Sequence, residues 1–145
     1  MEGLLGSVLI GKSGNVGMTP LNEAKYVLLY FSAHYCPPCR EFTPKLAMFY
    51  DSVNFDERKV EVVFVSQDRT IEKFNEYYDE MPWLAIPYEA VEIRTALIER
   101  YRGQTIPSLV LIDLQGNIKK NACRMDVANK GPLCLSDWDA ALNSN

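Results

Sequence analysis

The stretch that decides the fold is YVLLYFSAHYCPPC, residues 26–39. Its first six residues are strand formers, and an amphipathic run follows its two cysteines. At this spacing Cys36 and Cys39 can reach each other across one helical turn and cycle between dithiol and disulfide. A thiolate at a helix N-terminus meets unpaired N–H groups and the positive end of the helix dipole, which lower its pKa from about 8.5 to roughly 7 or below. The stretch therefore predicts a strand, then a helix that begins at a reactive thiol.

The helix after the cysteines has independent support. Phe42, Leu46, Phe49 and Val53 recur at helical steps and form one apolar stripe, which predicts a helix over residues 38–53. Pro44 lies inside this pattern, where it removes one helical hydrogen bond, so we expect a kink there.

The two prolines between the cysteines limit which backbone groups can stabilise a thiolate. Neither Pro37 nor Pro38 has an N–H group. We therefore expect a Cys36 thiolate to receive hydrogen bonds from the amides of Cys39 and Arg40.

Composition and charge exclude several classes of protein. The length of 145 residues predicts a single domain, residues 1–145, with 48% hydrophobic and 23% charged content. The formal net charge of −4 leaves no basic surface for nucleic acid. No run approaches the ~18 apolar residues of a membrane span, and Glu2 stands where a signal peptide would be basic. Four cysteines are too few for a disulfide scaffold, so we expect a reducing, cytoplasmic compartment. We also expect a monomer.

Strands and helices alternate along the chain. Strands are predicted at residues 26–31 and 60–65, and hairpins at residues 7–15 and 108–120. Helices are predicted at residues 38–53, 70–78, 91–101 and 136–142, with Thr70 and Ser136 as caps. This order predicts an α/β fold, with a central mixed β-sheet flanked by helices and an N-terminal β-hairpin extension.

That order, with Cys-x-x-Cys where the first core strand meets its helix, resembles the thioredoxin fold. The blocks FSAHYCPPCR (31–40), FTPKL (42–46), VFVSQD (63–68), MPWLAIP (81–87) and IPSL (106–109) resemble the tryparedoxin and nucleoredoxin branch. The resemblance implies a thiol-disulfide oxidoreductase that reduces disulfides in other proteins, peroxiredoxins among them, without a bound cofactor or metal. Its electrons would come from a low-molecular-weight dithiol or a reductase.

The reaction we expect begins with Cys36, which lies nearer solvent at the helix start. Cys36 attacks the substrate disulfide, and Cys39 resolves the mixed disulfide. The thioredoxin fold implies a cis Ile106-Pro107 bond opposite the thiols, where the loop would pair with the substrate backbone. The candidate substrate-binding residues are Tyr35, Pro37, Pro38, Arg40, Ile106 and Pro107, with Tyr35 flanking the entrance and Arg40 attracting acidic groups on a partner.

Two other classes of function stay open at this point. A disulfide isomerase or a thiol-peroxide reductase would use the same motif at a different reduction potential. A non-enzymatic binding module would keep the cis-proline groove without turnover, although two intact cysteines argue against it.

Several residues have plainer interpretations. Cys123 and Cys134 could complete a zinc site with the first pair, but their wide spacing favours free, buried thiols. We expect His34 in a solvent-facing loop without a carboxylate partner, Asp68 as a helix cap or turn residue, and Trp83 in the core. Tyr30 stands where thioredoxin has a buried Asp, and a phenol of pKa about 10 is a weak proton acceptor.

Overall fold

Two long parallel strands form the centre of the protein. The computed structural model describes residues 1–144. In it, β3 (Tyr26–Ser32) pairs with β4 (Val60–Ser66) in a register that begins at Tyr26 opposite Val60. Every residue of both strands is buried. Parallel strands that are covered on both faces have sequences that are continuous apolar runs, so these two strands are the easiest to predict from the sequence.

Across residues 1–144 the sheet has seven strands, in the order β2-β1-β5-β4-β3-β6-β7. On one side of the centre, β6 (Ser108–Ile112) runs antiparallel to β3 and is followed by β7 (Ile118–Lys120). On the other side, β5 (Leu84–Ala85) runs parallel to β4. The hairpin of β1 (Leu9–Gly11) and β2 (Gly14–Val16) extends this edge through Ile10 opposite Ala85. The predicted mixed sheet and N-terminal hairpin are confirmed.

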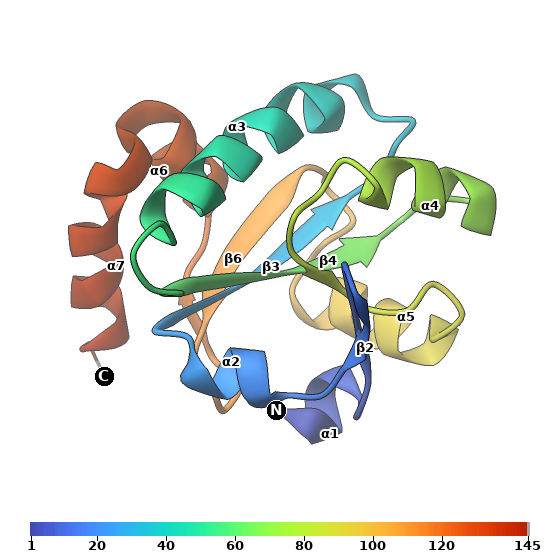
Figure 1. The fold of residues 1–145 in the computed structure, drawn as a ribbon, viewed down its shortest axis with the longest axis horizontal. Coiled ribbons are helices and arrows are strands. Elements are labelled where there is room, and N and C mark those ends of the chain that lie inside the picture. Colours follow the sequence, from blue (N-terminus) through green and yellow to red (C-terminus); the bar gives the residue numbers. More distant parts are fainter. Residues whose placement is uncertain (145) are drawn as a thin grey trace.

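Helices cover both faces of the sheet (Figure 1). One face carries α3 (Pro37–Val53), α4 (Ile71–Tyr78), α6 (Cys123–Lys130), the 3₁₀-helix η1 (Gly131–Cys134) and α7 (Leu135–Leu142). The other carries α1 (Glu2–Leu5), α2 (Thr19–Glu23) and α5 (Val91–Arg100). Alternate residues of β3 divide between the two cores, so that Leu28 and Tyr30 face α3 whereas Leu29 and Phe31 face α5.

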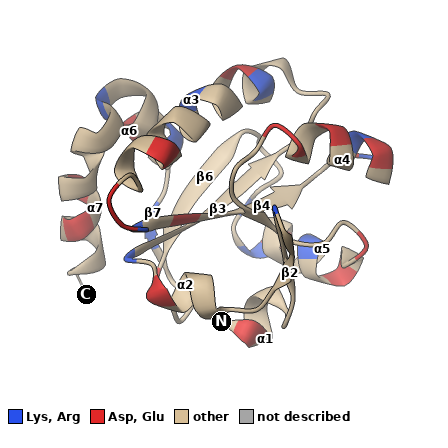
Figure 2. Cartoon of the chain, viewed as in Figure 1, with Lys and Arg blue, Asp and Glu red and all other residues tan. Residues whose placement is uncertain are grey.

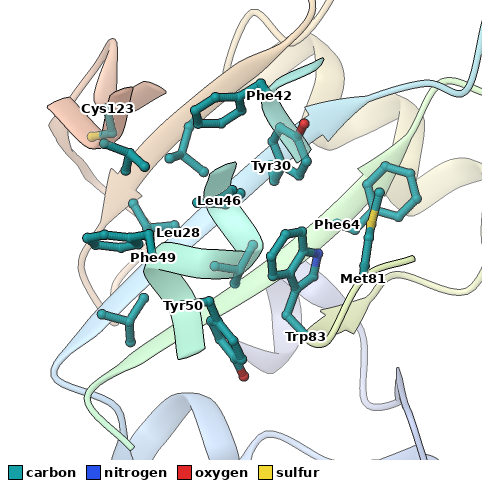
Figure 3. Packing of buried hydrophobic residues seen from close by; sticks show 14 of the residues in the cluster. Leu28, Tyr30, Phe42, Leu46, Phe49, Tyr50, Phe64, Met81, Trp83 and Cys123 are labelled. Carbon is teal, nitrogen blue, oxygen red and sulfur yellow. The ribbon is translucent and has the colours of Figure 1, made fainter. Parts of the chain in front are cut away.

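The core under α3 is rich in aromatic side chains. Figure 3 shows Tyr30, Phe64 and Trp83 packed between α3 and the sheet. The Trp83 ring meets those of Tyr30 and Tyr50 edge to face, with centroids 5.9 and 5.6 Å apart. Trp83 is 1% exposed, which confirms its assignment to the core.

The helix ends show where local sequence rules hold and where they fail. Thr70 caps α4, as predicted, by accepting the Lys73 N–H at 3.2 Å. Ser136 does not cap α7, because η1 leads directly into that helix and the Ser136 hydroxyl donates back to the Leu133 carbonyl. The helix α3 continues through Pro44. None of the helices within residues 1–144 is long and apolar enough to span a bilayer.

Candidate functional site

The two thiols of the Cys-x-x-Cys pair lie at the start of α3. Cys36 is the N-cap of the helix, with φ −98° and ψ 109°, and its Sγ accepts the Cys39 N–H at 3.3 Å. Cys36 is 9% exposed and Cys39 is fully buried, so Cys36 is nearer solvent, as predicted. The Arg40 amide was the wrong choice of second donor, since it bonds the Cys36 carbonyl at 3.1 Å in the first helical turn.

The loop before β6 faces Cys36. The Ile106-Pro107 bond is cis, as the resemblance implied. The Ile106 carbonyl oxygen lies 3.9 Å from the Cys36 Sγ. This proximity follows from the sheet, because β6 begins at Ser108, which is paired with Phe31 at the end of β3. The structure thus brings Cys36 together with the 106–107 loop, 70 residues apart in the chain.

Cys39 lies in a different environment, one turn inside the helix. Burial raises the pKa of its thiol to about 11, and the adjacent Cys36 adds to the shift. A hydrogen bond with the Ser32 side chain acts in the opposite direction. At neutral pH Cys39 is therefore a protonated thiol held beside the Ser32 hydroxyl.

Four buried hydroxyl groups form a cluster next to Cys39, which we call the hydroxyl cluster: Tyr30, Ser32, Thr43 and Tyr77. The Tyr77 hydroxyl lies 2.6 Å from both the Ser32 and Thr43 oxygens. The Tyr30 hydroxyl lies 2.8 Å from Thr43 and 3.3 Å from Ser32. Burial raises the pKa of Tyr30 and of Tyr77, so both phenols stay neutral at physiological pH. Tyr30, whose place in the sequence was compared with the buried Asp of thioredoxin, is thus one member of a neutral hydrogen-bonded cluster.

Sequence reasoning noticed Tyr30 but missed the other three members. A signal existed, because Ser32 ends an otherwise apolar strand and Thr43 adjoins Phe42 on the buried side of α3. Buried hydroxyls are hydrogen-bonded in folded proteins. Two such residues on adjoining elements could have been read as a buried polar pair.

The loop residues around His34 narrow one expectation and correct another. Asp68 lies in the connection between β4 and α4, where it is buried and does not cap a helix; its carboxylate accepts the His34 backbone N–H at 2.7 Å and the Ser66 hydroxyl at 2.8 Å. It thereby fixes the loop that precedes Cys36 to the end of β4. The His34 ring does have a carboxylate nearby, since its Nε2 lies 4.0 Å from Glu76 on α4.

The rim of the thiol site is exposed and carries aromatic and cationic groups. Tyr35 is 48% exposed, and the guanidinium carbon of Arg69 lies 4.8 Å from its ring centroid. Pro37, Pro38 and Arg40 are exposed at the first turn of α3. Arg69, which follows Asp68, was not among the predicted site residues.

Cys123 and Cys134 lie in α6 and η1, buried and free, as predicted. Burial raises the pKa of each thiol to about 12. No group of three or more His, Cys, Asp and Glu side chains in residues 1–144 is arranged to hold a metal ion. The four thiols therefore do not converge on the zinc cluster that was one reading of the sequence.

A central mixed sheet, a Cys-x-x-Cys pair at a helix N-terminus and a facing cis-proline loop define a thioredoxin-fold protein with a dithiol site. The family model described as Thioredoxin-like matches residues 23–118, and the chain belongs to this family.

Relatives and solved structures agree with the predicted branch. The chain is 43% identical over 116 residues to nucleoredoxin from Danio rerio, an alignment that covers 80% of this chain and 28% of that protein. It thus spans less than a third of the curated nucleoredoxins that it matches first. The structure of tryparedoxin from Trypanosoma brucei superposes with a TM-score of 0.82 at 37% identity over 91% of each chain. Thioredoxin from Wuchereria bancrofti gives 0.79 at 40% identity over 95% of this chain and 97% of that one.

Proposed function

We propose that residues 1–145 form one thioredoxin-like domain that reduces protein disulfides by dithiol exchange. The observation that carries the proposal is the position of Cys36, at the N-cap of α3, with its sulfur 3.3 Å from the Cys39 amide and 3.9 Å from the Ile106 carbonyl. Family membership supports the same chemistry.

In the first step the Cys36 thiolate attacks one sulfur of the substrate disulfide. A bond forms between Cys36 and that sulfur, the substrate disulfide breaks, and the other substrate sulfur leaves as a thiolate. The Cys39 amide and the positive end of α3 favour the negative charge on Cys36 before attack. The Ile106 carbonyl beside the sulfur is positioned to pair with the backbone of an extended substrate segment.

In the second step Cys39 loses its proton and attacks the Cys36 sulfur. The mixed disulfide breaks, and the second substrate sulfur leaves as a thiolate that takes up a proton. The substrate gains two electrons from the two cysteines, one proton that Cys39 gives up and one proton from solvent, and the chain is left with a Cys36-Cys39 disulfide. Because Cys39 is fully buried, it meets the mixed disulfide but not solvent.

The proposed partners follow from this cycle. The recipients are protein disulfides, with peroxiredoxins as one class, and the donor is a low-molecular-weight dithiol or a reductase that attacks the oxidised pair at Cys36. The chain has four cysteines, too few for a disulfide scaffold, which supports a reducing location such as the cytoplasm.

Insulin reduction with dithiothreitol tests the proposal. The protein should accelerate precipitation of the insulin B chain well above the uncatalysed rate, and Cys36→Ser should abolish the acceleration. Cys39→Ser should trap a mixed disulfide through Cys36, visible by intact mass. A rate equal to dithiothreitol alone would favour the binding module over the enzyme.

A further inference from the structure

Two arginines beside the thiols lie at the rim without an ion pair. Arg40 follows Cys39 in the first turn of α3, and Arg69 follows β4; both are exposed. Neither guanidinium has a carboxylate oxygen within 4.0 Å among residues 1–144. We call Arg40 and Arg69 the arginine rim.

The acidic side chains close to the arginine rim are largely neutralised by lysines. Glu41 lies 3.9 Å from Lys45 on α3, and Glu76 lies 3.3 Å from Lys73 on α4. Glu72 on α4 is exposed and has no such partner within residues 1–144. Figure 2 shows positively and negatively charged residues next to one another at the start of α3 and along α4. The side chains without an ion pair in these segments therefore include two arginines, the exposed Glu72 and the buried Asp68, whose carboxylate is occupied by the His34 N–H and the Ser66 hydroxyl.

Contact with Tyr35 holds Arg69 near the reactive sulfur. The Arg69 guanidinium stacks on the Tyr35 ring, and Tyr35 directly precedes Cys36 in the chain. The backbone of Arg40 is fixed close to the same sulfur, because it belongs to the helix that Cys36 caps. Both arginines are therefore close to the thiol that a substrate cystine has to reach.

We propose that the arginine rim makes the site selective for protein disulfides flanked by acidic residues. The inference rests on the proposed function and names the substrate class of the same site. A guanidinium binds carboxylates in a planar, two-pronged geometry, and an unpaired guanidinium has its donors free to do so. Charge complementarity at a rim acts mainly on the rate of productive encounter, and salt screens it.

The net charge of the whole chain has the opposite effect on an acidic peptide, so the two contributions can be told apart. A chain of net charge −4 repels an acidic peptide at long range. A preference for acidic flanks must therefore come from groups near the thiols, and not from the overall field.

The test uses two synthetic peptides of equal length, each with one intramolecular disulfide, flanked by glutamates in one and lysines in the other. The reduced full chain is mixed with each peptide, the reaction is quenched with acid, and the second-order rate constant is measured by chromatography. We expect the glutamate peptide to react about tenfold faster at low ionic strength, with the ratio falling towards about twofold in 0.5 M NaCl.

Charge-reversal variants test whether the rate difference between the two peptides comes from the arginine rim. The variants Arg40→Glu and Arg69→Glu should each lower the ratio, and the double variant should invert it by accelerating the lysine peptide, a gain that misfolding cannot produce. The matched control is Lys119→Glu, which changes net charge equally on the outer strand β7 and should leave the ratio unchanged.

Two results would overturn the inference. Equal rates for the two peptides in the unmodified chain, or an unchanged ratio in the double variant, would refute selection by the arginine rim while leaving disulfide reduction intact. Absence of reaction with either peptide, together with no insulin reduction, would overturn the proposed function and this inference with it.

Discussion

Removing one hydroxyl of the hydroxyl cluster, by Tyr77→Phe, should destabilise the reduced protein measurably. The Tyr77 hydroxyl is 2.6 Å from both Ser32 and Thr43, so the variant loses two buried hydrogen bonds. The ring itself should keep its place, because its edge-to-face contact with Phe64, at 5.5 Å, does not involve the hydroxyl.

The magnitude follows from what the remaining hydroxyls can still do. A typical hydrogen bond contributes about 0.5–1.5 kcal/mol net, which gives about 1–3 kcal/mol for two. Ser32 and Thr43 each keep a partner in Tyr30, at 3.3 and 2.8 Å, so neither becomes a buried orphan that adds its full desolvation penalty. For a domain of this size, about 2 kcal/mol corresponds to a fall in Tm of roughly 4–8 °C.

Urea unfolding of the reduced protein, followed by tryptophan fluorescence, measures the loss, with an unchanged m-value as the sign that two-state unfolding holds. The matched control is Tyr88→Phe, which removes one partly buried hydrogen bond, 2.8 Å to the Asp68 carbonyl. Adding Thr43→Val to Tyr77→Phe should be less costly than the sum of the single changes, because the two residues share a bond. A Tyr77→Phe variant no less stable than Tyr88→Phe would refute the argument for a cooperative cluster.

Three further predictions concern thiols and a buried acid. Iodoacetamide at neutral pH should modify Cys36 well before Cys39, which is fully buried with a pKa of about 11; peptide mapping showing Cys39 labelled first would reverse their roles. Replacing Cys123 or Cys134 by Ala should leave the insulin reduction rate within about twofold, because burial raises the pKa of both to about 12 and keeps them protonated. Burial also raises the pKa of Glu61, so its stabilising contribution is complete below its unfolded pKa of about 4.3 and is lost as pH rises through the folded value. Because glutamine does not titrate, the free energy of unfolding of Glu61→Gln relative to the parent should rise between pH 4 and pH 7; a constant difference in urea titrations would contradict this.

The parts of the fold that the sequence predicts are those set by long, local patterns. The strands at β3 and β4 and the helix α3 follow from continuous apolar runs and a clear helical stripe. The short elements α1, α2 and β5 escaped prediction, since four, five and two residues carry too little periodicity to be read. Their form is imposed by the surfaces on which they pack.

In the candidate site, too, the sequence predicts the local features and misses the contacts between distant residues. The position of Cys36 and the bond from the Cys39 amide are local, and the sequence predicts both. The Arg69 stack on Tyr35 and the contacts of Tyr77 with Ser32 and Thr43 join residues that lie 34 or more positions apart, which only the fold brings together.

The hydroxyl cluster also bears on how the second step handles its proton. In the proposed second step Cys39, whose pKa is raised, must lose a proton before it attacks, yet the phenols of Tyr30 and Tyr77 already hold their own protons and cannot take another. The cluster can instead stabilise the thiolate by donation, with the Ser32 hydroxyl as the group next to Cys39. In the proposed cycle the thiolate released from the substrate is a base that forms only after Cys36 has attacked. If it takes the Cys39 proton, Cys39 ionises only once a mixed disulfide is in place, which agrees with its burial and raised pKa in the reduced protein.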